Sequence, residues 1–199
     1  MDHTRFVFLC IIKVTDKQSM SKNLVERIRN HDRRAMSELY QQYVGLLSSV
    51  CYRYVPSEDD AKDILQNSFV KIFTSLPQFE YRNEPSFEGW MVRVVVNEAL
   101  HFLRDSKRLQ FTDIQEAAAQ LTDEEDPDTE HISADELHQL ISQLPVGYRT
   151  VLNLYVFENY PHKRIAELLG IKEASSASQF HCAKRLLTKR IKALLNKRR

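Results

Sequence analysis

The sequence predicts an all-α protein in which two helical domains are joined by a flexible acidic linker. Apolar residues recur at the i, i+3, i+4 and i+7 spacing of amphipathic helices in nearly every periodic segment of the 199 residues. Ten acidic and no basic residues lie between 109 and 136, whereas eleven basic residues lie between 161 and 199. A basic terminal unit is typical of a protein that binds a polyanion. The acidic stretch beside it is typical of a linker, because its negative charge is repelled by the polyanion.

The helices of the first domain are delimited by local capping and stop signals. We expect a short helix over 21–29, a second over 32–55, a third after Ser57, and a fourth after the irregular segment 77–85. The expected signals are Asp32 as cap and Pro56 as stop for the second helix, Ser57 and Pro77 for the third, and Ser86 and about Arg104 for the fourth.

The remaining helices belong to a second domain that follows the acidic segment. Pro127 and a weak helical pattern over 114–121 make that segment a linker. The helices expected beyond it cover 134–143, 146–157, 162–169 and 172–197, punctuated by Pro145, Pro161 and Gly170. The complete division is an extension of residues 1–20, a first domain of 21–107, a linker of 108–133 and a second domain of 134–199.

The amino-terminal extension contains the apolar run 6–12, which is too short to span a membrane and lacks a signal-peptide cleavage pattern. We interpret it as a product of a start codon upstream of Met20; a short strand or a weak signal sequence is the alternative.

Composition argues against several classes of protein. Four glycines are too few for a phosphate-binding loop or a dinucleotide fingerprint. Cys10, Cys51 and Cys182 are odd in number and have neither a Cys-x-x-Cys nor a paired-histidine context, so we expect no disulfide framework, metal or cofactor, and a reducing cytoplasm. No catalytic constellation is visible, and we predict that the protein is not an enzyme.

The last two helices, hinged at Gly170, form a predicted helix-turn-helix. With Phe180 taken as the inward direction of the final helix, Ser176 also points inward, whereas Cys182 points outward and Gln179 lies on a flank. We predict that Gln179 reads a base, because its amide can pair bidentately with adenine.

The two domains in this order resemble an extracytoplasmic-function sigma factor, a small specificity subunit of bacterial RNA polymerase. The block "SELYQQYVGLLSSVCYRYVPSEDDAKDILQNSFVKIFTSLPQFEYRNEPSFEGWMVRVVVNEALHFLR" looks like region two of that family. The block "LPVGYRTVLNLYVFENYPHKRIAELLGIKEASSASQFHCAKRLL" looks like region four. The resemblance implies binding to core RNA polymerase and to promoter DNA, assistance in melting the promoter, and control by an anti-sigma factor.

The resemblance also implies three binding surfaces. Polymerase docking is expected at Asp59, Asp63 and Gln66. Contacts to the melted minus-ten element are expected from Phe79, Tyr81, Arg82, Asn83, Arg93, Asn97 and Arg104, with Trp90 expected in the core. Contacts to the minus-thirty-five duplex are expected from Lys163, Arg164, Ser175, Ser178, Gln179, His181, Lys184, Arg185 and Lys189.

One three-residue segment and two single residues depart from the family pattern. Ala174-Ser175-Ser176 replaces a common Gly-Thr-Val, which leaves a polar Ser176 facing inward. The family often has an arginine near the position of Cys182, and it commonly has an aspartate at the position of His101. The alternative reading of the whole chain is a stand-alone helix-turn-helix regulator; an enzyme is a more distant alternative.

Overall fold

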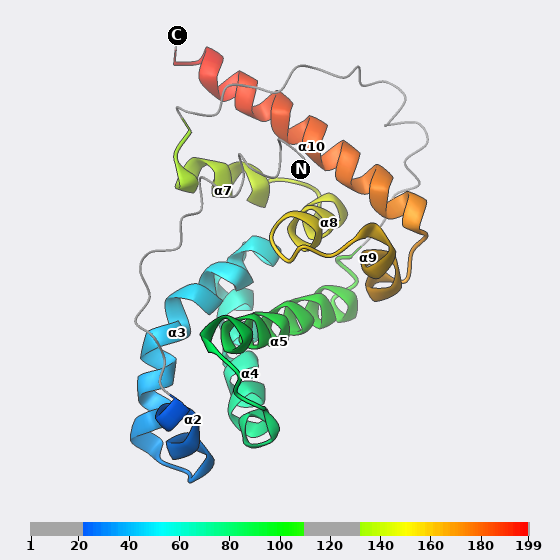
Figure 1. Cartoon of the computed structure of the whole chain (residues 1–199). Coiled ribbons are helices and arrows are strands. Elements are labelled where there is room, and N and C mark those ends of the chain that lie inside the picture. Colours follow the sequence, from blue (N-terminus) through cyan, green and yellow to red (C-terminus); the bar gives the residue numbers. More distant parts are fainter. Residues whose placement is uncertain (1–21, 110–131, 199) are drawn as a thin grey trace. The chain divides into compact units, whose positions relative to one another are not determined.

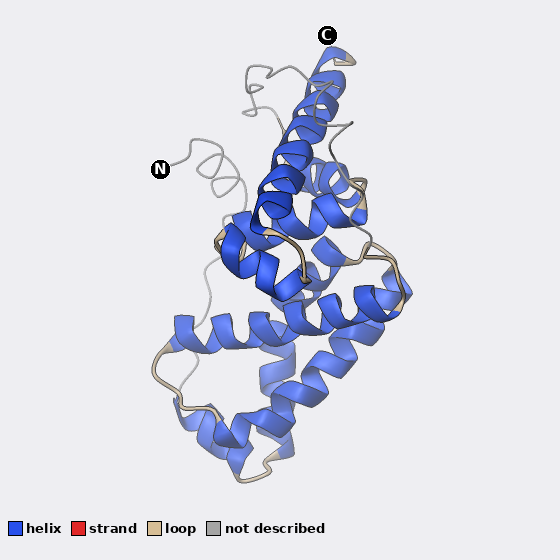
Figure 2. Ribbon diagram, turned by 90° about the vertical axis from the view of Figure 1, so that its right-hand side faces the viewer, coloured by secondary structure: helices blue, strands red, loops and turns tan. Residues whose placement is uncertain are grey.

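The structure is a computed structural model that describes residues 22–109 and 132–198. These residues form helices joined by turns and loops, and Figure 2 shows no strand among them. The all-α prediction is therefore confirmed for the described part of the chain. The predicted extension of residues 1–20 and most of the predicted linker of 108–133, including the weak helical pattern over 114–121, lie outside the described residues. The described residues divide into two compact units on either side of the boundary between Lys107 and Arg108.

The described residues of the first unit form four α-helices and one short 3-10 helix. Figure 1 labels the four α-helices. Its elements are α2 (Lys22–Arg29), α3 (Arg33–Tyr54), α4 (Glu58–Ser75), η1 (Leu76–Gln78) and α5 (Glu84–Asp105). Helices α3, α4 and α5 pack on one another in pairs, while α2 packs on α3 and η1. Fully buried side chains fill the centre, among them Leu39, Leu47, Ile72, Phe87 and Met91.

Two of the three predicted caps in this unit are confirmed. The Asp32 carboxylate accepts hydrogen bonds from the first backbone N–H groups of α3, and the Ser57 hydroxyl caps α4. The prediction that Ser86 caps α5 was wrong. Asn83 is the cap instead, and its Oδ1 accepts from the Ser86 N–H at 2.9 Å. Pro85, the last residue of the segment expected to be irregular, lies in the first turn of α5 instead. Proline fits there because its missing N–H would have no intrahelical partner.

The second unit contains α7 (Ala134–Ser142), α8 (Val146–Val156), α9 (His162–Leu169) and α10 (Glu173–Asn196). In Figure 1, α10 runs as one long helix past the other three, and it packs against each of them. A capping box between Ser133 and Glu136 starts α7. Gly170 ends α9 in the left-handed conformation at φ 68°, as expected for a helix-terminating glycine.

Buried Arg149 closes the turn between α7 and α8. Its Nη1 donates to the carbonyls of Ser142 and Leu144, and burial lowers the pKa of its guanidinium to about 10. Among the described residues, no helix combines the length and the apolar character that crossing a bilayer requires.

Candidate nucleic-acid and partner-binding surfaces

The predicted polymerase-docking residues lie on one exposed side of α4. Asp59, Asp63 and Gln66 are all exposed and follow i, i+4, i+7 spacing, which places them on one strip of the helix. Val70, which lies one further turn along that strip, is 57% exposed, whereas most large apolar side chains of the unit are buried. We call these four residues the α4 face. Sequence reasoning missed Val70, although its i+4 position after Gln66 was the available signal.

The first half of the predicted minus-ten loop packs against α5. The ring of half-buried Phe79 stacks on Trp90, with centroids 4.6 Å apart, and lies 5.3 Å from the buried Phe87 ring. Trp90, which was expected in the core, is half-buried: its ring lies 5.7 Å from that of buried Phe87, and part of its side chain stays exposed. The rings of Phe79, Phe87 and Trp90 are mutual neighbours, and Phe79 and Trp90 form the more exposed part of this aromatic stack.

The second half of the loop is anchored through Glu84. Tyr81 Oη donates to Glu84 Oε2 at 3.2 Å, and buried Tyr43 donates to Oε1 of the same carboxylate. Burial and the neighbouring carboxylate both raise the pKa of each tyrosine, so both hydroxyls remain protonated donors. One carboxylate at the start of α5 therefore ties the loop to the core helix α3.

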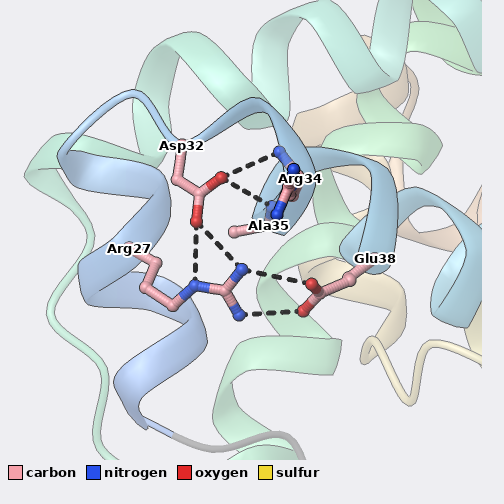
Figure 3. Close-up of polar contacts among 5 residues, drawn as sticks. All are labelled: Arg27, Asp32, Arg34, Ala35 and Glu38. Carbon is pink, nitrogen blue, oxygen red and sulfur yellow. Dashed lines mark hydrogen bonds and ion pairs between the residues drawn. The ribbon is translucent and has the colours of Figure 1, made fainter.

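A second anchor comes from α2, which sequence reasoning did not assign to the site. Arg29 donates through Nη2 to the Phe79 carbonyl at 2.5 Å. The preceding turn of α2 is fixed by Arg27, which bonds Asp32 through Nε at 2.9 Å and Glu38 through both terminal nitrogens at 3.0 and 3.1 Å (Figure 3). The hydrogen bond from Arg27 is the main cause that lowers the pKa of the Asp32 carboxyl. No local signal predicts the Arg29 contact, because its partner is 50 residues away.

The other residues of the predicted minus-ten surface are exposed. Arg82 and Asn83 lie on the loop, although Asn83 uses its Oδ1 to cap α5. Arg93, Asn97 and Arg104 line one side of α5. His101, which lies between Asn97 and Arg104 along α5, is also exposed. Its Nδ1 is 3.0 Å from Asp105 Oδ2, so Asp105 is the local partner of the histidine that replaces the family's common aspartate.

The predicted minus-thirty-five surface is mostly accessible. Lys163 and Arg164 at the start of α9 are exposed, and Arg164 also pairs with Glu167 at 3.1 Å. On α10 the exposed members are Ser178, His181 and Lys189, and the half-buried members are Ser175, Lys184 and Arg185.

The predictions for Gln179 and Cys182 were wrong. Gln179 is 1% exposed and Cys182 is 2% exposed, whereas Phe180 is only half-buried. The prediction used one inward direction for all of α10, but this helix packs against α9 as well as α8 and α7, so the buried side turns along its length. Gln179 therefore cannot reach a base edge. Ser176 faces inward as predicted, with no exposed surface.

Replacing Gln179 by methionine is expected to stabilise the second unit by about 1 kcal/mol without changing DNA sequence preference. The reason is that Gln179 Oε1 is buried without a hydrogen-bond partner among the described residues, and methionine has a similar shape without the buried carbonyl. Urea denaturation measures the stability, and Ser178→Ala at the exposed neighbouring position is the control, with a change under about 0.5 kcal/mol. A loss of stability combined with a changed sequence preference would restore Gln179 as a base reader.

Comparison with known proteins identifies two family regions in the chain. The family model for Sigma-70 region 2 matches residues 39–109, and the model for Sigma-70 region 4 matches residues 134–187. The chain is 28% identical to the RNA polymerase sigma-H factor of Pseudomonas aeruginosa, over 89% of this chain and 97% of that protein. It is also 28% identical to the ECF RNA polymerase sigma-E factor of Haemophilus influenzae, over 90% of this chain and 99% of that protein. A solved sigma factor from Bartonella quintana, in complex with an anti-sigma factor, is 14% identical with a TM-score of 0.48 over 78% of this chain and 96% of the other.

Proposed function

We propose how this chain, which belongs to the sigma-70 family and to its extracytoplasmic-function group, divides the work of a sigma factor among its surfaces. The protein binds core RNA polymerase, directs it to promoters and helps to melt them. The observation that carries this conclusion is the presence of regions 2 and 4 in that order, one in each compact unit. In our proposal the region-two domain covers 21–107 and the region-four domain 134–199, with 1–20 as an extension and 108–133 as the linker.

The α4 face docks on the polymerase. Asp59 and Asp63 supply negative charge for a basic partner surface, Gln66 supplies an amide, and exposed Val70 supplies apolar area at the end of the strip. Charge complementarity of this kind favours one orientation of the partner and speeds association. The nearby Glu58–Lys62 pair, at 2.7 Å, is internal to the helix and leaves both aspartates available.

The loop 79–83 and the exposed side of α5 hold the melted strand of the minus-ten element. Unpaired bases bind by stacking on aromatic rings, which contributes about 1–3 kcal/mol per base. Tyr81 and the outer side of the Phe79–Trp90 stack provide rings, and Arg82 provides positive charge beside them. The anchors at Glu84 and Arg29 support this role because a pre-ordered loop loses less conformational entropy when DNA binds. Strand separation then draws on binding energy, so the protein needs no catalytic group for it.

The turn between α9 and α10 enters the minus-thirty-five duplex. Small exposed side chains near the start of α10 let the backbone approach the major groove, where Ser178 and His181 can contact base edges. Phosphates are contacted by Lys163, Arg164, Lys184, Arg185 and Lys189, and half-buried Ser175 is a further DNA contact near the start of α10. The polymerase and the minus-ten contacts also contribute to the overall affinity for the promoter. The turn between α9 and α10 therefore needs only to select the position at which the protein binds the DNA.

We also propose where the protein acts and what regulates it. The protein acts in the cytoplasm, where its polymerase and promoters are, and an anti-sigma factor controls it by covering the docking and DNA surfaces. The acidic linker spans the two promoter elements and discourages DNA binding by the free protein, because its charge repels phosphate.

Run-off transcription from genomic fragments tests the function directly. Core polymerase is supplied with and without the protein, and specific starts should appear only with it. If the folded protein binds DNA but no fragment gains a specific start, the stand-alone regulator is the better description.

Replacing Lys189 by alanine should weaken binding to all promoter sequences equally and make it less sensitive to salt. Each phosphate contact contributes about 0.9 to the slope of log affinity against log salt concentration, so the slope should become shallower by about that amount. The slope is measured from the affinity of the holoenzyme for promoter DNA at salt concentrations of about 50 to 300 mM. Lys62→Ala, which removes an exposed lysine from α4, should leave the slope unchanged. A sequence-selective loss for Lys189→Ala would contradict a phosphate contact.

A further inference from the structure

Ser176, the polar residue that faces inward at the start of α10, has a specific partner. Its Oγ lies 3.0 Å from Nδ1 of His162, the first residue of α9. The two residues are 14 positions apart and join the helix-turn-helix across its turn. Ser176 has no exposed surface, so its hydroxyl depends on partners inside the protein.

The imidazole of His162 is also held by aromatic rings from two other helices. It stacks on Tyr155 of α8 with ring centroids 4.5 Å apart and planes within 9°. Phe180, one turn after Ser176 on α10, lies 5.9 Å from the imidazole and 4.5 Å from the Tyr155 ring. Contacts from α8, α9 and α10 therefore meet at this one histidine.

We propose that His162 and Ser176 form a positioning pair that fixes the orientation of the first turns of α10 on α9 and α8. This inference rests on the proposed function, in which those turns enter the minus-thirty-five duplex. The exposed residues Ser178 and His181 follow Ser176 by two and five positions on the same helix, so a tilt of α10 at Ser176 moves both of them relative to the DNA. A misplacement of about 1 Å is enough to weaken hydrogen bonds, whose strength falls steeply with distance and angle.

The pair also makes the position of α10 sensitive to pH. A neutral His162 can accept a hydrogen bond from the Ser176 hydroxyl at Nδ1. A protonated ring carries its own N–H there, so the bond must reverse: Ser176 Oγ accepts, and its buried hydroxyl proton must turn to another partner. Burial, the main cause, lowers the pKa of His162, while Glu173 of α10 acts in the opposite direction. Lys163 is the adjacent cation on α9, and α8 presents the Tyr155 ring.

The sign of the pH effect follows from the lowered pKa. The folded protein favours the neutral His162 ring, which accepts the hydrogen bond from Ser176. This arrangement is fully formed above the ordinary histidine pKa of about 6.5 and is lost as the pH falls through the lower pKa of His162 in the folded state. Recognition of the upstream element should therefore weaken in mildly acidic conditions.

A double-variant experiment with holoenzyme tests the pair. The readout is the ratio of affinities for a promoter found by run-off and for the same promoter with its minus-thirty-five element scrambled, measured from about pH 5.5 to 8 around the histidine pKa. Taking this ratio cancels the pH dependence of polymerase and of the minus-ten contacts. Every variant keeps His181, so a difference between variants does not come from that residue.

His162→Phe keeps the aromatic stack but leaves the Ser176 hydroxyl buried without this partner, and the ratio at pH 7.5 should fall by about threefold to tenfold, as expected for an unsatisfied buried hydroxyl. His162→Phe combined with Ser176→Ala removes the orphaned hydroxyl as well and should restore the ratio to within about twofold, because removing both partners is nearly neutral. Both variants should lack the acid-side decline of the parent protein. Thermal unfolding distinguishes altered recognition from unfolding.

Three results would overturn the inference. They are a ratio that His162→Phe leaves unchanged, a double variant that is no better than the single one although it is folded, and a double variant whose pH profile parallels that of the parent protein. If the parent holoenzyme does not distinguish the intact element from the scrambled one at any pH, the proposed role of α10 fails, and the inference fails with it.

Discussion

Replacing Asp63 by lysine is expected to lower the affinity of the protein for core polymerase by about 100-fold, since juxtaposed like charges cost several kcal/mol at an interface. Asp63 lies at the centre of the α4 face, between Asp59 and Gln66, and its side chain is exposed. The fold should tolerate the change, because lysine has a higher helix propensity than aspartate and position 63 lies beyond the first turn of α4. Competition with a labelled parent protein for core polymerase measures the affinity.

The matched control for this prediction is Ser75→Lys. It places the same charge on the same helix at an exposed position that lies more than three turns beyond Asp63 and projects about 120° away from it. Affinity should change by less than about threefold, as is usual for charges outside an interface. Equal losses for the two variants would indicate a general charge effect instead of a docking face, and an unchanged affinity for Asp63→Lys would move docking to another surface.

The helix bounds were predictable because their signals are local. Asp32, Ser57 and Gly170 act on backbone groups within four residues, so a single sequence is enough to recognise them. The start of α5 was missed by three residues. Proline breaks a helix in its interior but fits the first turn, and residue spacing alone does not distinguish these two positions.

The directions of side chains on α10 were less predictable, because burial depends on packing that the helix does not encode by itself. A helical wheel gives relative angles between residues, but the buried side must be set by the neighbouring helices. Here α10 passes several of them, and Gln179 and Cys182 are covered although Phe180 was the natural choice of inward residue. The sequence correctly marked Ser176 as an inward polar residue, but its partner His162 required the tertiary structure.

The loop anchors show the same limit at longer range. Phe79 and Tyr81 could be selected as stacking residues from their type and place in a loop. The contacts that hold them come from Arg29 and Glu84, which acquire this role only when α2 and α5 pack beside the loop. Residues that position a site therefore leave weaker traces in one sequence than residues that contact the ligand.

Replacing Phe87 by alanine is expected to have the largest effect on stability, a loss of about 3–5 kcal/mol, as is typical of a phenylalanine removed from a core. Phe87 has no exposed surface, and its ring is the common neighbour of four aromatic residues at 5.3–6.0 Å: Tyr43, Phe79, Tyr81 and Trp90. Two of these belong to the minus-ten loop. The cavity should therefore release the loop as well as weaken the core, and urea denaturation gives the first of these effects.

The second effect is separated from the first by Leu100→Ala, which removes another fully buried side chain from α5 but lies more than three turns beyond Phe87. We expect a comparable loss of about 2–5 kcal/mol in stability. At a temperature where both variants remain folded, holoenzyme with Leu100→Ala should still bind a single-stranded minus-ten oligonucleotide, and holoenzyme with Phe87→Ala should bind it at least about tenfold more weakly, the equivalent of losing one stacked base. If the two variants bind the oligonucleotide equally, Phe87 supports only the core, and the loop must be ordered by its polar anchors at Arg29 and Glu84 alone.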